Sequence, residues 1–161
     1  MKKLLLCFLV SASLISCTNQ ETKTETTGSV TTTGPDVDML KKGTTAFANG
    51  DWVTVASNYA DTAKSYHNIW PSNTDTTVGV TIPVIIEVFK NQRELIDGNL
   101  TIGGTIYEVV TMPNGSKYGH SWVEMSWKSK KGVAGKVVVF NSFGINKDGK
   151  ITYEWHIYDT K

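Results

Sequence analysis

The most constraining feature of the sequence lies in its C-terminal half, where long segments of alternating side chains are separated by short turns that each contain a glycine. The alternation predicts strands over residues 100–112, 117–128, 133–145 and 151–158. The turns are Pro113-Asn114-Gly115, Lys130-Lys131-Gly132 and Lys147-Asp148-Gly149. Asn-Gly and Asp-Gly readily take the positive φ that tight hairpins require. Three successive hairpins predict a curled antiparallel meander with a concave and a convex face.

The preceding segment predicts two helices that meet at a glycine. Asp36 or Asp38 can cap the first, and Gly50 offers a left-handed end. Its expected buried face consists of Val37, Leu40, Thr44 and Phe47. Asp51 can cap the second helix, whose expected stripe consists of Trp52, Val55, Ala56 and Tyr59.

A strand and a third helix are expected next. Residues 60–67 are predicted to form the strand, and residues 68–77 a loop. Thr81 can cap the third helix, in which Pro83 is tolerated only within the first turn. Its expected apolar face contains Ile82, Ile86 and Phe89.

The N-terminus has the pattern of a signal peptide. Two lysines precede an apolar run over residues 4–15, which is shorter than the roughly 20 residues of a membrane-spanning helix. The run ends in Leu14-Ile15-Ser16-Cys17, which resembles the bacterial lipobox. That resemblance implies cleavage before Cys17 and its lipidation; the alternative is an ordinary signal peptide with a chance cysteine. Lipidated Cys17 would anchor the protein to the membrane of the bacterial cell envelope.

Three segments are therefore expected. Residues 1–17 are the lipoprotein signal peptide, polar residues 18–35 form a disordered tether, and residues 36–161 form one domain. Thr18 follows the lipobox cysteine, and the lack of aspartate at that position favours the outer membrane.

Composition argues against several classes of function. The formal net charge is +1, which gives no strong field for nucleic acid. The cysteines are Cys7 and Cys17, so the expected domain contains no thiol for a disulfide, nucleophile or metal. His67, His120 and His156 lack metal-ligand spacing, and the sequence contains no phosphate loop. We therefore expect no metal and no cofactor.

The predicted order α-α-β-α-β-β-β-β resembles the nuclear transport factor 2-like (NTF2-like) superfamily, in particular its SnoaL-like branch of polyketide cyclases and ketosteroid isomerases. The similarity rests on Asn49-Gly50-Asp51-Trp52, on Tyr59-Ala60-Asp61-Thr62-Ala63 and on residues 149–159. It implies an α+β cone, in which a strongly curved antiparallel sheet wraps around three N-terminal-half helices and encloses an apolar pocket. Dimers through the outer sheet face are common in that superfamily.

The resemblance also suggests residues for proton-transfer chemistry. It places His67 where ketosteroid isomerases keep a carboxylate base, and a neutral imidazole can act as a base near pH 7. Asn141 falls where those enzymes hold an oxyanion with a protonated acid, and its amide can donate similarly. Both side chains have structural alternatives, as a histidine at a strand end and an amide that satisfies neighbouring polar groups. Gly43 replaces the oxyanion tyrosine, which argues against steroid isomerisation.

The strand over residues 117–128 presents two alternating sets of side chains. Tyr118, His120, Trp122 and Glu124 form one set, and Ser121, Val123, Met125 and Trp127 the other. We expect the second, more apolar set to face inward.

The function predicted from these features is the binding of a small, largely apolar ligand in the cone. The candidate ligand-binding residues are Trp52, Tyr59, Phe89, Val139 and Trp155. A cofactor-free isomerase, cyclase or hydrolase-type enzyme with His67 as general base and Asn141 as oxyanion donor is the first alternative. An envelope protein-interaction module is the second. A homodimer through the sheet is a candidate partner in each case.

Overall fold

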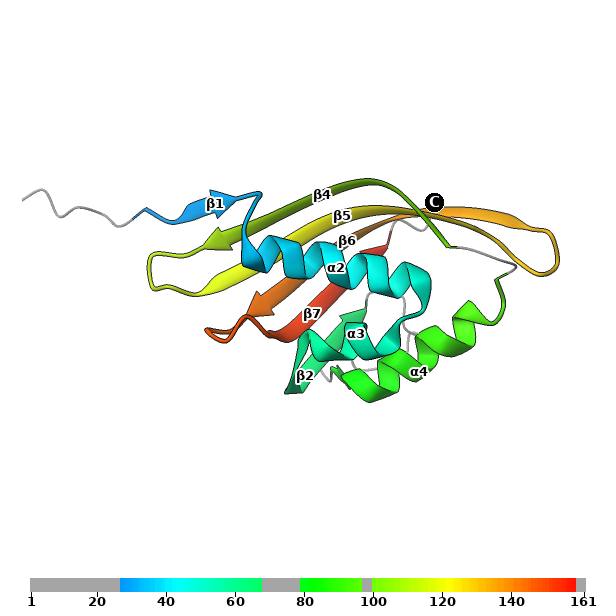
Figure 1. Ribbon diagram of the computed structural model, residues 1–161, viewed down its shortest axis with the longest axis horizontal. Helices are drawn as coiled ribbons and strands as arrows, with labels where there is room; N and C mark the ends of the chain where they lie inside the picture. The colour runs from blue at the N-terminus through cyan, green and yellow to red at the C-terminus, as the bar shows by residue number, and fades with distance from the viewer. Residues whose placement is uncertain (1–26, 68–78, 97–99, 159–161) are drawn as a thin grey trace, which may run out of the picture.

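The computed structural model describes residues 27–67, 79–96 and 100–158. Its elements are β1 (Ser29–Thr31), α2 (Pro35–Asn49), α3 (Trp52–Ser57), β2 (Tyr59–His67), β3 (Val80–Thr81), α4 (Ile82–Arg93), β4 (Thr101–Thr111), β5 (Lys117–Lys128), β6 (Ala134–Ile145) and β7 (Ile151–Tyr158) (Figure 1). The signal peptide, Cys17 and the 68–77 loop lie outside the described residues. Within those residues, no helix combines the length and apolarity needed to cross a membrane.

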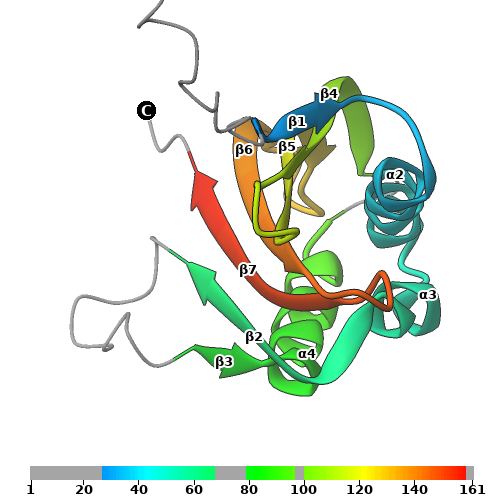
Figure 2. The same ribbon diagram turned by 90° about the vertical axis from the view of Figure 1, so that its left-hand side faces the viewer.

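The strands form one curved sheet in the order β1-β4-β5-β6-β7-β2-β3. Figure 2 shows the sheet bending around the side on which α2, α3 and α4 lie. The predicted meander is present: β4, β5, β6 and β7 pair antiparallel with their neighbours, and β5 and β6 pair from Lys117↔Ile145 to Lys128↔Ala134. The exception to the antiparallel expectation is β2, which pairs parallel with β7.

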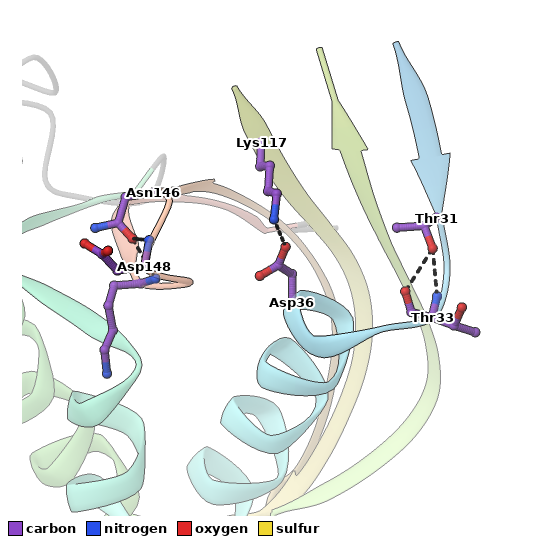
Figure 3. Close-up of polar contacts among 7 residues, drawn as sticks. Thr31, Thr33, Asp36, Lys117, Asn146 and Asp148 are labelled. Atoms are coloured by element: carbon purple, nitrogen blue, oxygen red, sulfur yellow. Dashed lines mark hydrogen bonds and ion pairs between the residues drawn. The ribbon is translucent and has the colours of Figure 1, made fainter. Parts of the chain in front are cut away.

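The three predicted hairpin turns are confirmed. Gly115, Gly132 and Gly149 have φ values of 83°, 83° and 71°. In the last turn, Asn146 Oδ1 accepts hydrogen bonds from the backbone N–H groups of Asp148 and Lys150, at 3.0 and 2.9 Å (Figure 3). Positive φ without a Cβ clash is what allows each turn to reverse the chain in so few residues.

The glycine junction between the first two helices is also confirmed. Gly50 ends α2 in the left-handed conformation, with φ 71°. The Asp51 carboxylate caps α3 by accepting a hydrogen bond from Thr54 N at 3.1 Å. Tyr59, expected on the stripe of the second helix, instead begins β2, since α3 ends at Ser57.

The predicted N-caps of the other two helices are confirmed only in part. Helix α2 begins at Pro35 after Gly34, without a side-chain cap. Asp36 lies in its first turn, where its carboxylate forms an ion pair with Lys117 Nζ at 2.7 Å and thereby ties α2 to β5 (Figure 3). Thr81 is the N-cap residue of α4, as predicted, but its side chain makes no capping hydrogen bond.

Among the described residues, the hydrophobic core forms two clusters. One joins α2 to the sheet through Val37, Leu40, Val109, Phe143, Ile145 and Ile151. The other joins the helices to β2 through Ala46, Val55, Ala63, Ile82, Ile85 and Ile86. Phe89 is partly buried against the second cluster.

The edges of the sheet are formed by two short strands that the sequence pattern did not predict, β1 and β3. Strand β1 lies in the segment expected to be a tether, and pairs with β4 through Ser29↔Thr111, Val30↔Val110 and Thr31↔Val109. Its side chains are all exposed, so it has no apolar periodicity to reveal it. On β4 the register shifts between Ile102 and Thr105, and β3 at the opposite edge is two residues long.

Candidate functional site

A cavity of about 600 Å³ lies between the helices and the concave face of the sheet. Its helical wall includes Gly43, Thr44, Phe47, Trp52, Val55, Phe89, Gln92 and Arg93. Its sheet wall includes Tyr59, Val123, Met125, Trp127, Val137, Val139, Asn141, Phe143, Glu154, His156 and Tyr158. Apolar and aromatic side chains predominate, as is typical of small-molecule sites.

Aromatic contacts organise the helical wall. The Phe47 ring packs edge-to-face against Trp52 and Phe89, with centroids 5.7 and 5.1 Å apart. These residues come from three different helices, so the cluster holds the three helix ends together while presenting an apolar surface to the cavity.

Four of the five candidate ligand-binding residues line the cavity: Trp52, Tyr59, Phe89 and Val139. Trp155 does not, and its prediction as a pocket residue is wrong. It is 40% exposed and stacks on Tyr66, with ring centroids 4.6 Å apart. Along β7 the inward positions are those of Glu154, His156 and Tyr158, which places Trp155 on the convex face.

The orientation predicted for β5 is correct. Val123, Met125 and Trp127 line the cavity. On the other side of the sheet, His120 Nδ1 lies 3.1 Å from Glu108 Oε1, and the Trp122 ring lies 4.9 Å from that of Phe140. His120 and Glu124 are therefore remote from the cavity, and Trp122 contributes to an apolar outer face.

The polar part of the cavity is a continuous network on four strands, β2, β5, β6 and β7. The Tyr59 hydroxyl donates to Glu154 Oε2, and Glu154 Oε1 lies 2.8 Å from His156 Nε2. His156 Nδ1 lies 2.5 Å from Asn141 Oδ1, and Asn141 Nδ2 donates to Ser121 Oγ at 3.0 Å. His156 thus bridges Glu154 and Asn141, with an oxygen atom beside each of its ring nitrogens.

Burial and charge act in opposite directions on Glu154, which is 1% exposed. Burial would raise the pKa of its carboxyl, but the His156 charge and the hydrogen bonds from His156, Ser65 and Tyr59 outweigh it and lower that pKa. Burial, reinforced by the Glu154 charge, raises the pKa of Tyr59 well above its usual value. The same two causes raise the pKa of Tyr158. Near neutral pH the network therefore contains a carboxylate and neutral phenols.

Of the two candidate catalytic residues, Asn141 lies in the cavity wall and in this network. His67 is the last residue of β2, and its backbone lies opposite that of His156; its side chain is outside the described part of the structure. Sequence reasoning missed Glu154 and His156. The available signal was the alternation of polar side chains in β7, but Trp155 and Ile157 made the opposite face appear to be the buried one.

Gly43 also lies on the cavity wall. A Cβ at this position would approach Asn58 Nδ2 to 2.8 Å, so a larger residue there would require the Asn58 side chain to shift. Among the described residues, no group of three or more His, Cys, Asp and Glu side chains is arranged to hold a metal ion.

No protein-family profile and no curated protein sequence matches this chain. Solved structures do. IdmH, a candidate polyketide cyclase from Streptomyces antibioticus, has a TM-score of 0.61 and 14% identity over 78% of this chain and 93% of its own. A ketosteroid isomerase-like protein from Erwinia carotovora atroseptica has a TM-score of 0.56 and 17% identity over 77% and 93%.

A SnoaL-like polyketide cyclase candidate from Shewanella denitrificans has a TM-score of 0.53 and 10% identity, over 77% of this chain and 90% of its own. At such identities the likeness concerns the fold. The predicted α+β fold, a curved open sheet with few helices, is confirmed as NTF2-like.

Proposed function

We propose that this NTF2-like domain binds a small, largely apolar organic molecule in the cavity between its helices and the concave face of its sheet. The observation that carries the proposal is a cavity of about 600 Å³ whose wall is mainly aromatic and aliphatic and holds one compact polar network. A volume of this size suits one drug-sized molecule, and the network would orient it.

A pair of adjacent valines provides a matched test. Val139 lines the cavity at 2% exposure, whereas Val138 lies on the convex face at 42% exposure. We expect a metabolite screen to find compounds that raise the Tm of the purified protein. Val139→Phe should abolish the shift and Val138→Phe should keep it. A screen with no hits, or equal shifts in both variants, would contradict the proposal.

The second candidate function is cofactor-free proton transfer at a carbon acid. Three contacts favour it: Glu154 and Asn141 hold His156 from both sides, and Tyr59 supports Glu154. In this proposal the neutral imidazole of His156 takes the proton from the carbon acid and later returns it, and Asn141 supplies a hydrogen bond to the developing oxyanion. His67 remains a second candidate base because its backbone pairs with that of His156.

Solvent exchange tests this function without knowledge of the substrate. A panel of ketones in D₂O is followed by NMR for incorporation of deuterium next to the carbonyl. We expect accelerated exchange of at least one ketone, lost in His156→Gln and kept in His120→Gln on the convex face. Loss in His67→Gln alone would assign the base to His67, and no acceleration of any ketone would argue against enzymatic proton transfer.

The proposed site of action is the bacterial cell envelope, with the domain anchored in the outer membrane through lipidated Cys17. Support comes from the lipobox-like sequence Leu14-Ile15-Ser16-Cys17 after an apolar run. Replacement of Cys17 by Ser should move the protein from the membrane fraction to the soluble fraction. Unchanged fractionation would contradict the anchor.

A homodimer through the convex sheet face is the partner that we propose. Large apolar side chains are exposed there, among them Trp122 at 37%, Val138 at 42% and Ile157 at 47%. Trp122→Glu should convert the dimer to a monomer in sedimentation equilibrium. A wild-type protein that sediments as a monomer at all concentrations would overturn the proposal.

A further inference from the structure

Arg93, the last residue of α4, brings a positive charge to the cavity wall. Its Nη2 donates to Ala48 O at 2.7 Å, and this carbonyl belongs to the last turn of α2, where carbonyls have no partner within the helix. The contact fixes the guanidinium in place and ties the ends of α2 and α4 together.

The other terminal nitrogen of this guanidinium is left unsatisfied. Nη1 is buried and has no hydrogen-bond partner among the described residues. A buried donor without an acceptor is costly, and more so when it carries charge. An acceptor brought by a bound molecule would remove that cost.

Arg93 also has no carboxylate beside it in the described part of the structure. None of the ion pairs among the described residues includes Arg93. The acidic residue of the described cavity wall is Glu154, whose carboxylate contacts His156 and Tyr59 instead. The guanidinium therefore has no anionic partner among these residues.

The apolar surroundings of Arg93 define the rest of the ligand. Phe89 lies one helical turn earlier, on the same face of α4, and belongs to the aromatic cluster with Phe47 and Trp52. An anionic group at Arg93 would place an attached apolar body against these rings.

We propose that the cavity ligand is an organic carboxylate with an apolar body, and that Arg93 binds its carboxylate. This inference rests on the proposed ligand-binding function and narrows its ligand class. A carboxylate matches the planar guanidinium better than a neutral oxygen does, and charge-assisted hydrogen bonds are about twice as strong as neutral ones. The carboxylate group could belong to a fatty acid or to an aromatic acid.

The test compares matched acids and alcohols by isothermal titration calorimetry. Decanoate is paired with 1-decanol, and 2-naphthoate with 2-naphthalenemethanol, which separates fatty from aromatic sources. All titrations use the full chain with Cys17→Ser, so that no lipidated form is present. We expect at least one acid to bind about tenfold or more tightly than its alcohol, given the strength of charge-assisted hydrogen bonds.

Variants at Arg93 assign the preference to this side chain. Arg93→Gln should abolish the preference for the acid while leaving binding of the alcohol similar, and Arg93→Lys should retain part of it. Lys41→Gln, which removes one exposed positive charge on α2, should change neither. If Arg93→Gln unfolds, the Arg93→Lys comparison decides, with a weakened acid preference expected.

The outcomes separate this inference from the proposed function. Equal binding of acid and alcohol in the parent protein, or an acid preference that survives Arg93→Gln, overturns the role of Arg93 and leaves apolar ligand binding intact. No binding of any probe, together with a blank metabolite screen, overturns both. Binding of acids other than these probes in that screen, with the same loss in Arg93→Gln, supports the inference.

Discussion

The buried pair of Glu154 and His156 allows a quantitative prediction about stability. When His156 is protonated, the charged atoms of the pair are 2.8 Å apart, which corresponds to an attraction of about 6 kcal/mol at an effective dielectric constant of about 20. Desolvation of both ions offsets most of this attraction, so the net value of the pair is small. Removal of one partner is different, because it leaves the other charge buried alone.

We therefore expect Glu154→Leu to lower the free energy of unfolding by about 3–5 kcal/mol at neutral pH. It deprives His156, Tyr59 and Ser65 of an acceptor at a position that is 1% exposed. Glu154→Gln should cost less, about 1–2 kcal/mol, since its amide can still accept from Tyr59 and donate to a neutral imidazole. The double variant Glu154→Leu/His156→Leu should be more stable than the two single losses predict, with a coupling of about 2–3 kcal/mol.

Urea unfolding, followed by far-UV circular dichroism, measures the free energy of unfolding of wild type, of Glu154→Leu, of His156→Leu and of the double variant. These four values form the double-mutant cycle. The pH dependence adds a check of sign. Because the pKa of Glu154 is lowered in the folded state, its contribution is complete above its unfolded value of about 4.5 and is lost as the pH falls through the folded value. The stability difference between wild type and Glu154→Leu should shrink in that acid range. A cost below about 1 kcal/mol for Glu154→Leu, or a coupling near zero, would refute the reasoning.

Three further predictions concern the framework. Gly135→Ala should destabilise the fold by about 1–3 kcal/mol, because its Cβ would overlap the Trp127 indole across the β5–β6 pair; calorimetry that finds no loss would contradict this close approach. Leu40→Ala, at 4% exposure, should cost about 2–5 kcal/mol in urea unfolding, and a smaller cost would mean that α2 repacks. Tyr59→Phe should leave the gain in phenolate absorbance between roughly pH 9 and 11 unchanged, since the raised pKa keeps Tyr59 neutral there; a smaller gain would show that Tyr59 does ionise in that range.

The parts of the fold that were predictable from sequence depend on local chemistry. Gly50, Asp51 and turn glycines such as Gly115 shape the backbone only within a few residues of their own positions. Their effects can therefore be recognised from the local sequence. The two faces of β5 were also predictable, because alternate residues of a strand point to opposite faces and the more apolar set is the one buried. The apolar set that includes Val123 and Met125 does face the cavity.

The missed parts depend on contacts between distant segments. The parallel pairing of β2 with β7 has no local signature, and β1 has exposed side chains and is held by backbone hydrogen bonds to β4. In β7 the usual burial of apolar side chains and exposure of polar ones is reversed. Glu154 and His156 point inward, while Trp155 points outward. Buried charges can occupy such positions when each finds its partners, and those partners come from β2 and β6.

The sheet edges described above have a consequence for aggregation. An open edge strand can recruit a strand of another molecule through its unpaired backbone groups. At one edge, β1 covers Val109 to Thr111 of β4, and the register shift between Ile102 and Thr105 makes the rest of that edge irregular. At the opposite edge, the outermost strand β3 is only two residues long. These features shorten the run of regularly spaced backbone groups at both edges, which disfavours strand addition there.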